Sequence, residues 1–497
     1  MFFCVSLCAL CGYLTAEKRK EKVHAESAKD LSCRTFEIKK MKLLKRIILL
    51  LLLAGLAYGI RYAWVSFPIM SGFTAKNMCS CVFVAGRDAK SVEEQEMGSF
   101  PLSLANYKVD SSDRSVTSTV FGIAKKKAIY REGFGCTLVN ELSEEDIRKQ
   151  PAPVFAKAPV QADSAQWPSG NKAAEYIPSN IDFARLAKLC KQEVLKTNGK
   201  GQQEARALLV VYDGRLISEN YAPGFDKNSK MLGWSMAKSI TSAMIGLLVQ
   251  QGKLDVQQPA PVPEWADAKD ERHAITLQHL LQQTSGLDFE ENYNKSSNAT
   301  IMLFNKADMA AYTASRPLKD KPGTNFYYSS GNSNILSRIV RQTVGDKNYH
   351  AFIYDSLLYK LGMYNTVIEP DASGTMVGSS YVFATAQDWA RFGLLYYNNG
   401  AANGQQLFTG DWVKQTSTPS SADQLQQYGY QFWLNGLDKK MPSQRKFSAA
   451  PADMFYADGY AGQYVFIIPS KKLIIVRLGF KNFDENELLR KILQCVK

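Results

Sequence analysis

The order of helical and strand-like segments predicts an α+β protein. We expect an antiparallel sheet flanked by terminal helices, with an all-helical subdomain between its parts. Three observations predict this class: a helix and a hairpin open the region that begins near residue 180, two strands and a helix close the chain, and the segments between them are mostly helical. Helices segregated to the faces of an antiparallel sheet are one of the few stable layer arrangements for such a pattern.

The segments at both ends of this region have regular patterns. Residues 181–195 show the three-to-four-residue apolar spacing of an amphipathic helix. Residues 205–212 and 215–221 are predicted to form the two strands of a β-hairpin, joined by Asp213-Gly214, a dipeptide typical of a two-residue hairpin turn. At the end of the chain the sequence predicts two more strands and a closing helix, at residues 464–469, 473–478 and 485–496.

The first 67 residues predict a charged extension followed by an export signal or a membrane anchor. Residues 1–46 hold eleven Lys and Arg against five Asp and Glu, so nearly half of the net charge of +13 precedes the first apolar run. We interpret 1–40 as an N-terminal extension. Residues 41–67 combine a basic start, the 14-residue apolar run 47–60 and aromatic residues beyond it. We favour an uncleaved anchor of a bacterial inner-membrane protein, with its basic end in the cytoplasm and the rest of the chain on the periplasmic side.

Residues 68–179 show no recognisable chemistry. The segment 150–178 is rich in Pro, Ala, Gln and Ser and predicts a linker. Either Cys79 or Cys81 would form a disulfide with Cys136 if this region is exported, and packed free thiols are an equal alternative. Short β-type runs occur at residues 82–84, 116–123 and 135–139.

Composition argues against two classes of partner. Apart from its N-terminal part, the chain is only modestly basic and has no arginine-rich helix or repeated aromatic-basic pattern, so we expect no nucleic acid. The nine cysteines form no paired Cys-x-x-Cys framework of the zinc type, and the four histidines are scattered. We therefore expect neither a metal nor another cofactor. The sequence does not indicate an oligomeric state.

Ser235 and Lys238 form the pattern around which a catalytic site is expected. Residues three apart lie on one face of a helix, so the lysine amine can reach the serine hydroxyl and activate it, provided that burial keeps the amine partly deprotonated. The spacing alone is weak evidence, because Ser169–Lys172 and Ser443–Lys446 also match it in polar surroundings. Only Ser235 precedes an apolar helical stretch, at 240–249.

Together with later segments, this pattern resembles the serine β-lactamase and penicillin-binding-protein superfamily. The closest likeness is to the class C-like branch of esterases and 6-aminohexanoate-dimer hydrolases. Residues 234–238 resemble the first motif of the superfamily, and 322–331 resemble the second, in which a tyrosine follows the proline by six. The resemblance covers roughly 180–497 and implies a β-lactamase/transpeptidase-like fold. Three further segments match in the expected order, at residues 275–287, 383–393 and 459–463.

The resemblance and the chemistry imply a role for each of three side chains. Ser235 would attack an ester or amide carbonyl and form an acyl-enzyme, with Lys238 as its base. Tyr328 would be a second proton carrier. Its neighbour Tyr327 is an alternative, but the position six residues after Pro322 favours Tyr328.

Four further residues are expected to bind the substrate or its oxyanion. Ser330 stands two residues after the tyrosine, where the family often has asparagine. The oxyanion hole would combine the backbone N–H of Ser235 with one from the strand near Tyr460. Gly459 and Gly462 would permit close approach of a substrate, and simple strand-end glycines are an equal alternative.

One departure from the family bears on the substrate. Where the third motif usually offers Lys or His to hold a substrate carboxylate, this chain has Asp458 after an alanine. The departure favours esters, uncharged amides or a basic substrate, although a solvated loop carboxylate is the simpler interpretation of Asp458. We predict a membrane-anchored serine hydrolase acting on a small ester, amide or peptide. A β-lactamase or D,D-peptidase acting on cell-wall peptides, and a non-hydrolytic sensor or binding module, are the alternatives.

An α/β-hydrolase is not expected. That mechanism places a catalytic histidine late in the chain after the serine and an acidic residue. The last histidine here is His350, with 147 residues beyond it, and no parallel βαβ pattern surrounds it.

Overall fold

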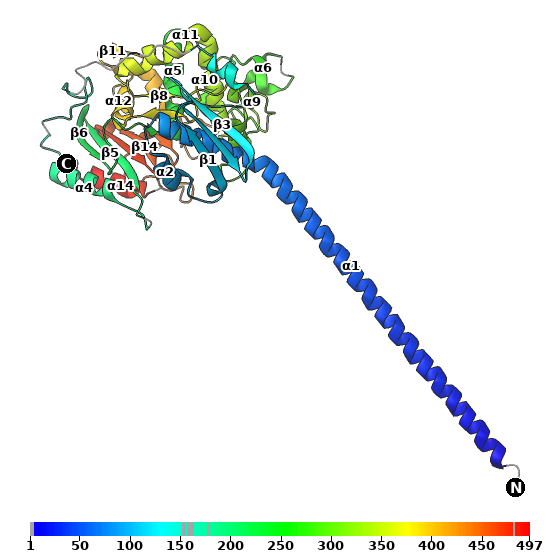
Figure 1. Ribbon diagram of the computed structural model, residues 1–497. Helices are drawn as coiled ribbons and strands as arrows, with labels where there is room; N and C mark the ends of the chain where they lie inside the picture. The colour runs from blue at the N-terminus through cyan, green and yellow to red at the C-terminus, as the bar shows by residue number, and fades with distance from the viewer. Residues whose placement is uncertain are drawn as a thin grey trace. The chain divides into compact units, whose positions relative to one another are not determined.

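The computed structural model describes residues 4–151, 156, 164–175, 178–199, 201–267, 269–480 and 483–497. Its contacts divide the chain into two units, residues 1–65 and 66–497. Helix α1, Cys4–Phe83, is a single helix whose N-terminal part belongs to the first unit and whose last turns belong to the second (Figure 1). It is long and apolar enough to cross a membrane, a test that a signal sequence also passes. The strand expected at 82–84 is wrong, because Val82 and Phe83 continue α1 and pack beside its buried cysteines.

The second unit is built on a six-stranded antiparallel sheet with the order β12-β13-β14-β15-β5-β6. Pairing of β15 with β5, for example Ile475 opposite Val210, joins the two ends of the region, as the sequence predicts. The strands are β5 (Ala205–Tyr212), β6 (Arg215–Tyr221), β12 (Trp433–Leu434), β13 (Phe455–Gly459), β14 (Gln463–Ile468) and β15 (Leu473–Gly479).

Helices cover both faces of this sheet. Alternate side chains of β5 point to opposite faces: Leu208 packs with α4 (Phe183–Leu195) and α14 (Glu485–Leu493), whereas Leu209 packs with α12 (Ala386–Tyr397). Both faces are therefore buried, and the strand is buried along its whole length and apolar apart from Arg206 instead of alternating. The terminal helices predicted from the sequence are confirmed (Figure 1).

The middle of the chain is mostly helical, as predicted, and carries a three-stranded sheet with the order β7-β9-β8. Side chains cap several of its helices: Ser329 caps α10 through the Asn332 N–H, and Thr276 opens α7 with a capping box. The principal elements are β7 (Met231–Leu232), α5 (Ala237–Gln250), α6 (Pro263–Ala266), α7 (Leu277–Leu281), α8 (Asn298–Asn305), α9 (Met309–Ala314), α10 (Ser330–Val344), α11 (Asp346–Ile353), β8 (Val367–Ile368), β9 (Val382–Ala384) and α13 (Gly410–Thr416).

A second, four-stranded antiparallel sheet with the order β1-β2-β3-β4 precedes this region. It confirms the β-type runs expected at 116–123 and 135–139. Part of the linker expected at 150–178 lies outside the described residues, and the described part at 164–175 packs on α12 through hydrogen bonds from Arg391. The strands are β1 (Ala105–Asp110), β2 (Ser115–Val120), β3 (Ile123–Arg131) and β4 (Gly135–Leu138), and the short helices α2 (Ala89–Val92) and α3 (Glu144–Arg148) flank them.

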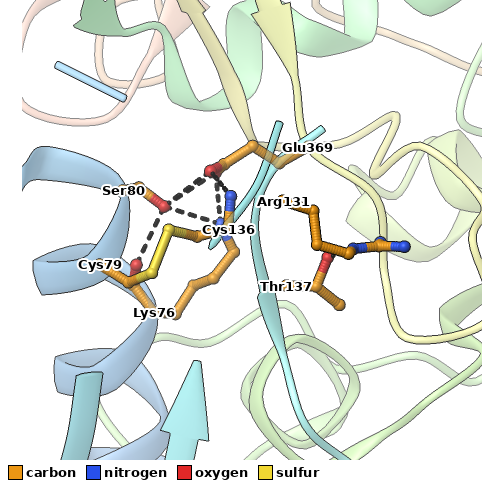
Figure 2. The surroundings of a disulfide bond; sticks show 7 residues. All are labelled: Lys76, Cys79, Ser80, Arg131, Cys136, Thr137 and Glu369. Carbon is orange, nitrogen blue, oxygen red and sulfur yellow. Dashed lines mark hydrogen bonds and ion pairs between the residues drawn. A yellow bond between two sulfur atoms is a disulfide. The ribbon is translucent and has the colours of Figure 1, made fainter. Parts of the chain in front are cut away.

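A disulfide between Cys79 and Cys136 joins the end of α1 to β4, with a Cα–Cα distance of 6.0 Å (Figure 2). Of the two pairings left open by the sequence, this one forms, and Cys81 is a buried free thiol. Beside the disulfide, buried Lys76 pairs with buried Glu369, which also accepts hydrogen bonds from Ser80 at 2.9 Å and from the Cys136 N–H at 2.6 Å. These contacts fasten three distant segments together, and the buried carboxylate of one segment has partners on the other two.

Candidate active site

Ser235 lies in a 3₁₀ turn, Trp234–Met236, that runs directly into α5. Trp234 adopts a φ of +47°, which is rare for a bulky residue and is sustained only by surrounding structure. Its ring stacks on Phe73 of α1 with centroids 6.3 Å apart, and Tyr460 packs edge-on against it at 5.8 Å. The serine is thus presented at the start of a buried helix, on a turn held by aromatic side chains.

Lys238, one turn into α5, is the centre of the hydrogen bonds around this serine. Its amine lies 3.0 Å from Ser235 Oγ, 3.0 Å from Ser330 Oγ and 3.0 Å from the carbonyl oxygen of Ser379. The side chain is 1% exposed, and this burial lowers the pKa of Lys238 to about 8. A measurable share of free amine, about one tenth, is then present at pH 7.

Tyr328 is the tyrosine brought to the serine. Its phenol lies close enough to interact with the Ser235 side chain, and its ring centroid lies 4.9 Å from the Lys238 amine. Burial raises the pKa of Tyr328 well above its usual value, so the phenol is neutral at neutral pH. Trp433 stacks on it at 5.3 Å and fixes the ring, whereas Tyr327 is 46% exposed.

Ser330 also reaches this cluster and connects it to a carboxylate. While Ser330 Oγ accepts the hydrogen bond from Lys238, its own hydroxyl donates to Glu291 Oε1 at 2.5 Å, and its backbone N–H donates to Glu291 Oε2 at 2.9 Å. Tyr293 donates to Glu291 at 2.7 Å and lies 3.0 Å from Ser330 Oγ. A chain of hydrogen bonds therefore runs from the amine to a carboxylate.

Glu291 and Tyr293 are the two members of this cluster that sequence analysis missed. Both lie in the loop between α7 and α8, where no periodicity or motif marks them. One indirect signal was available. Position 330 holds a serine where the family often has asparagine, so another polar group is needed to make the contacts of the missing amide.

The glycines predicted for the oxyanion region have different roles in the structure. A Cβ on Gly459 would lie 2.1 Å from the Gly233 carbonyl oxygen, so glycine is needed for β13 to approach the turn that carries the serine. Tyr460 follows at once and is 71% exposed. Gly462 has a φ of +85° in the turn to β14, and its carbonyl accepts a hydrogen bond from Arg477, which gives this glycine a conformational role.

Asp458 is not the solvated loop carboxylate that seemed the simpler interpretation, because it lies within β13 and is only partly exposed. Burial raises the pKa of Asp458 to about 7, and the nearby Lys446 opposes that rise. Its charge also raises the pKa of Lys238 slightly, after that of Glu291. The third-motif strand thus brings an acidic group toward the amine.

The two other Ser-x-x-Lys matches do not form comparable pairs. Lys172 pairs with Glu175 at 2.5 Å, and Lys446 donates to the Tyr456 hydroxyl at 3.0 Å. In the sequence, Ser235 differed from the other two serines by the apolar helix that follows it. In the structure, Lys238 is the only one of the three lysines that hydrogen-bonds its own serine among the described contacts.

The arrangement contains the parts that acyl transfer by a serine requires: a hydroxyl, an amine of lowered pKa in contact with it, and a neutral phenol close to both. The carboxylates of Glu291 and Asp458 partly offset the effect of burial, so the pKa of Lys238 falls less than burial alone would lower it.

Comparisons with known proteins agree with this geometry. The 6-aminohexanoate-dimer hydrolase of Paenarthrobacter ureafaciens is 26% identical over 297 residues, which are 55% of this chain and 72% of that protein. A penicillin-binding protein homolog from Caulobacter crescentus has 16% identity and a TM-score of 0.50, and covers 65% of this chain and 98% of its own. EstCE1, a hydrolase with promiscuous acyltransferase activity, has 15% identity and a TM-score of 0.51, with 63% and 99% coverage.

The two solved structures share the fold with this chain. A family model described as Beta-lactamase matches residues 134–492, which is more than half of the chain. The sheet built from both ends of the domain, the inserted helices and the order of the motifs all agree with that match. The chain therefore belongs to the Beta-lactamase family.

Proposed function

We propose that this protein is a serine hydrolase that cleaves an ester or amide through an acyl-enzyme on Ser235. The observation that carries the proposal is the contact between the Ser235 hydroxyl and a fully buried amine, 3.0 Å away, whose pKa is lowered to about 8. A lysine with this pKa is a base near neutral pH, whereas an ordinary lysine is almost wholly protonated there.

In the proposed reaction, neutral Lys238 takes the hydroxyl proton as Ser235 Oγ bonds to the substrate carbonyl carbon. The carbonyl π electrons move to oxygen, where the N–H groups of residues 235 and 460 stabilise the negative charge. Collapse of this intermediate breaks the bond to the alcohol or amine leaving group, which receives through Tyr328 the proton that Lys238 had taken, so the amine is neutral again. Water then attacks the acyl group with the same base, releases the acid and restores the serine.

The charges around the site favour a neutral or amine-bearing substrate. Asp458 and Glu291 are both near Lys238, and the third-motif strand offers Ala457 and Asp458 where a carboxylate-binding cation would stand. A carboxylate substrate would meet like charge at these positions. The name of one relative, 6-aminohexanoate-dimer hydrolase, specifies an amide substrate and supports the amide side of the proposal.

The test is hydrolysis of p-nitrophenyl esters, amide dimers and cephalosporins by the protein and by Ser235→Ala. The control is Ser239→Ala, since Ser239 is a buried serine one turn further along α5 that hydrogen-bonds the Gln431 carbonyl. We expect turnover to vanish in Ser235→Ala and to persist in Ser239→Ala. Undiminished turnover in Ser235→Ala would refute the proposal, and an acyl adduct that forms but never hydrolyses would favour the sensor alternative.

We further propose that α1 anchors the protein in a membrane and that the second unit lies outside the cytoplasm. The apolar run 47–60 has five basic residues at 39–46 on its N-terminal side, which favours a cytoplasmic start. The Cys79–Cys136 disulfide suits an oxidising compartment. Protease added to intact spheroplasts should digest the second unit, and its protection until lysis would contradict this orientation.

A further inference from the structure

Two large apolar side chains are exposed at one end of the four-stranded sheet. Phe121 and Ile123 are 65% and 58% exposed. Val120 pairs with Ile123 across the β2–β3 turn and with Ala105 at the start of β1, so this end also holds the start of β1. We call Phe121 and Ile123 the sheet-end patch.

The turn itself gives no reason for an aromatic residue. Phe121 and Gly122 connect β2 to β3 with φ values of +51° and +76°. A two-residue turn with both φ values positive favours Asn, Asp or Gly, and a bulky residue is unfavourable at its first position. Phe121 therefore incurs a conformational cost while its ring stays mostly in solvent, which points to a partner that covers it.

The sheet-end patch is attached to the part of α1 that follows the apolar run. The ring of Phe121 packs edge-on against Phe67 at 5.7 Å, and Ser71 Oγ donates to the Ala124 carbonyl at 2.5 Å. Phe67 comes seven residues after Ile60, the end of the apolar run. Even fully extended, seven residues reach about 25 Å at most, so the sheet-end patch stays within reach of the bilayer surface.

We propose that the sheet-end patch inserts into the interfacial layer of the membrane that α1 crosses. The occupant is lipid: the apolar side chains would lie near the headgroup–acyl boundary, and the exposed Lys125 and Lys108 would face anionic headgroups. The proposal rests on the anchoring part of the proposed function and adds a second contact with the same membrane, made by the folded unit itself.

This contact has a consequence for the active site. Six residues beyond Phe67 on the same helix, Phe73 stacks on Trp234, which precedes Ser235. A folded unit fixed to the bilayer at Phe121 could not pivot freely about α1, so the nucleophile turn would stay at a defined height above the membrane surface.

The test uses the full chain in vesicles of phosphatidylethanolamine and phosphatidylglycerol, with Phe121 replaced by the photocrosslinker benzoylphenylalanine. The matched control is the same replacement at Phe183, an aromatic residue of α4 that is 43% exposed. Replacement at Trp64, which is 83% exposed and close to the apolar run, reports on the anchor alone. After irradiation, mass spectrometry of the peptides identifies lipid adducts.

We expect lipid adducts at position 121 at a yield roughly tenfold or more above that at 183, since membrane burial of an aromatic side chain favours the inserted state by at least that factor. Adducts at 64 without adducts at 121 would overturn the proposal and leave the anchor intact. If neither position 64 nor position 121 gives lipid adducts, the proposal that α1 is a membrane anchor is overturned as well. Crosslinking of 121 to a second copy of the chain would show a protein interface in place of lipid. If the variant at 121 does not fold, the same replacement at Ile123 decides among these outcomes.

Discussion

Replacing Glu291 by Gln should shift the pH dependence of catalysis to lower pH. If Lys238 is the base, kcat/KM rises with pH as its amine loses a proton, with a midpoint of about 8. The carboxylate of Glu291 raises the pKa of Lys238, because a nearby negative charge favours the protonated amine. Glutamine keeps the shape and an oxygen that can accept from Ser330, but it removes this charge.

The size of the shift follows from the hydrogen bonds through Ser330, which are 3.0 Å to the amine and 2.5 Å to the carboxylate. They limit the separation of the charges to about 5.5 Å, where the attraction is about 3 kcal/mol at an effective dielectric constant of 20 and under 1 kcal/mol in bulk water. Since one pH unit corresponds to about 1.4 kcal/mol, the midpoint should fall by between about half a unit and about two units.

The assay is kcat/KM for the best ester substrate between pH 5.5 and pH 10 (roughly the range that brackets the lysine titration). Glu290→Gln is the matched control, because this neighbouring carboxylate pairs with Lys295 at 2.6 Å instead of with the site. Its profile should match that of the unmodified protein. A midpoint in Glu291→Gln that is unchanged or higher would refute the assignment of the pH dependence to Lys238.

Three further outcomes are expected. Lys238→Ala should lower kcat by roughly 10²- to 10⁴-fold, as for loss of a general base, with the melting temperature showing that the fold persists; unchanged turnover would remove the lysine from the mechanism. Replacing Cys79 and Cys136 by Ser opens a loop of 57 residues and should reduce the free energy of unfolding by about 4 kcal/mol, measured by denaturant titration against the oxidised, disulfide-bonded protein, and equal stability would contradict this estimate. Glu369→Ala leaves the buried Lys76 amine without its charge partner and should cost about 3–5 kcal/mol, whereas a loss below about 1 kcal/mol would show that the pair is dispensable.

The parts of the fold that the sequence predicted are those with strong local patterns. The hairpin around Asp213-Gly214 has its turn dipeptide, and the last strands and helix have clear apolar runs bounded by polar residues. The run at 82–84 failed because three residues of β-type composition carry little information when the preceding helix continues through them.

The residues of the candidate site also differ in how clearly the sequence marks them. Ser235, Lys238 and Tyr328 lie in motifs with fixed spacing, and the structure brings their side chains together. Glu291 reaches the site from a loop more than fifty residues after the serine, and only the folded chain places it against Ser330. The interpretation of Asp458 as a solvated residue was wrong. The short strand that holds it has no regular apolar pattern from which burial of its side chain could be inferred.

The most direct test of the central claim is the site of covalent modification by a fluorophosphonate. The probe transfers its phosphonyl group to an activated serine, and tryptic peptides locate the adduct by mass. We expect one adduct per chain at Ser235, dependent on pH with a midpoint of about 8 and lost in Lys238→Ala. An adduct at another serine, or labelling of Ser235 that persists undiminished without the lysine, would contradict the account.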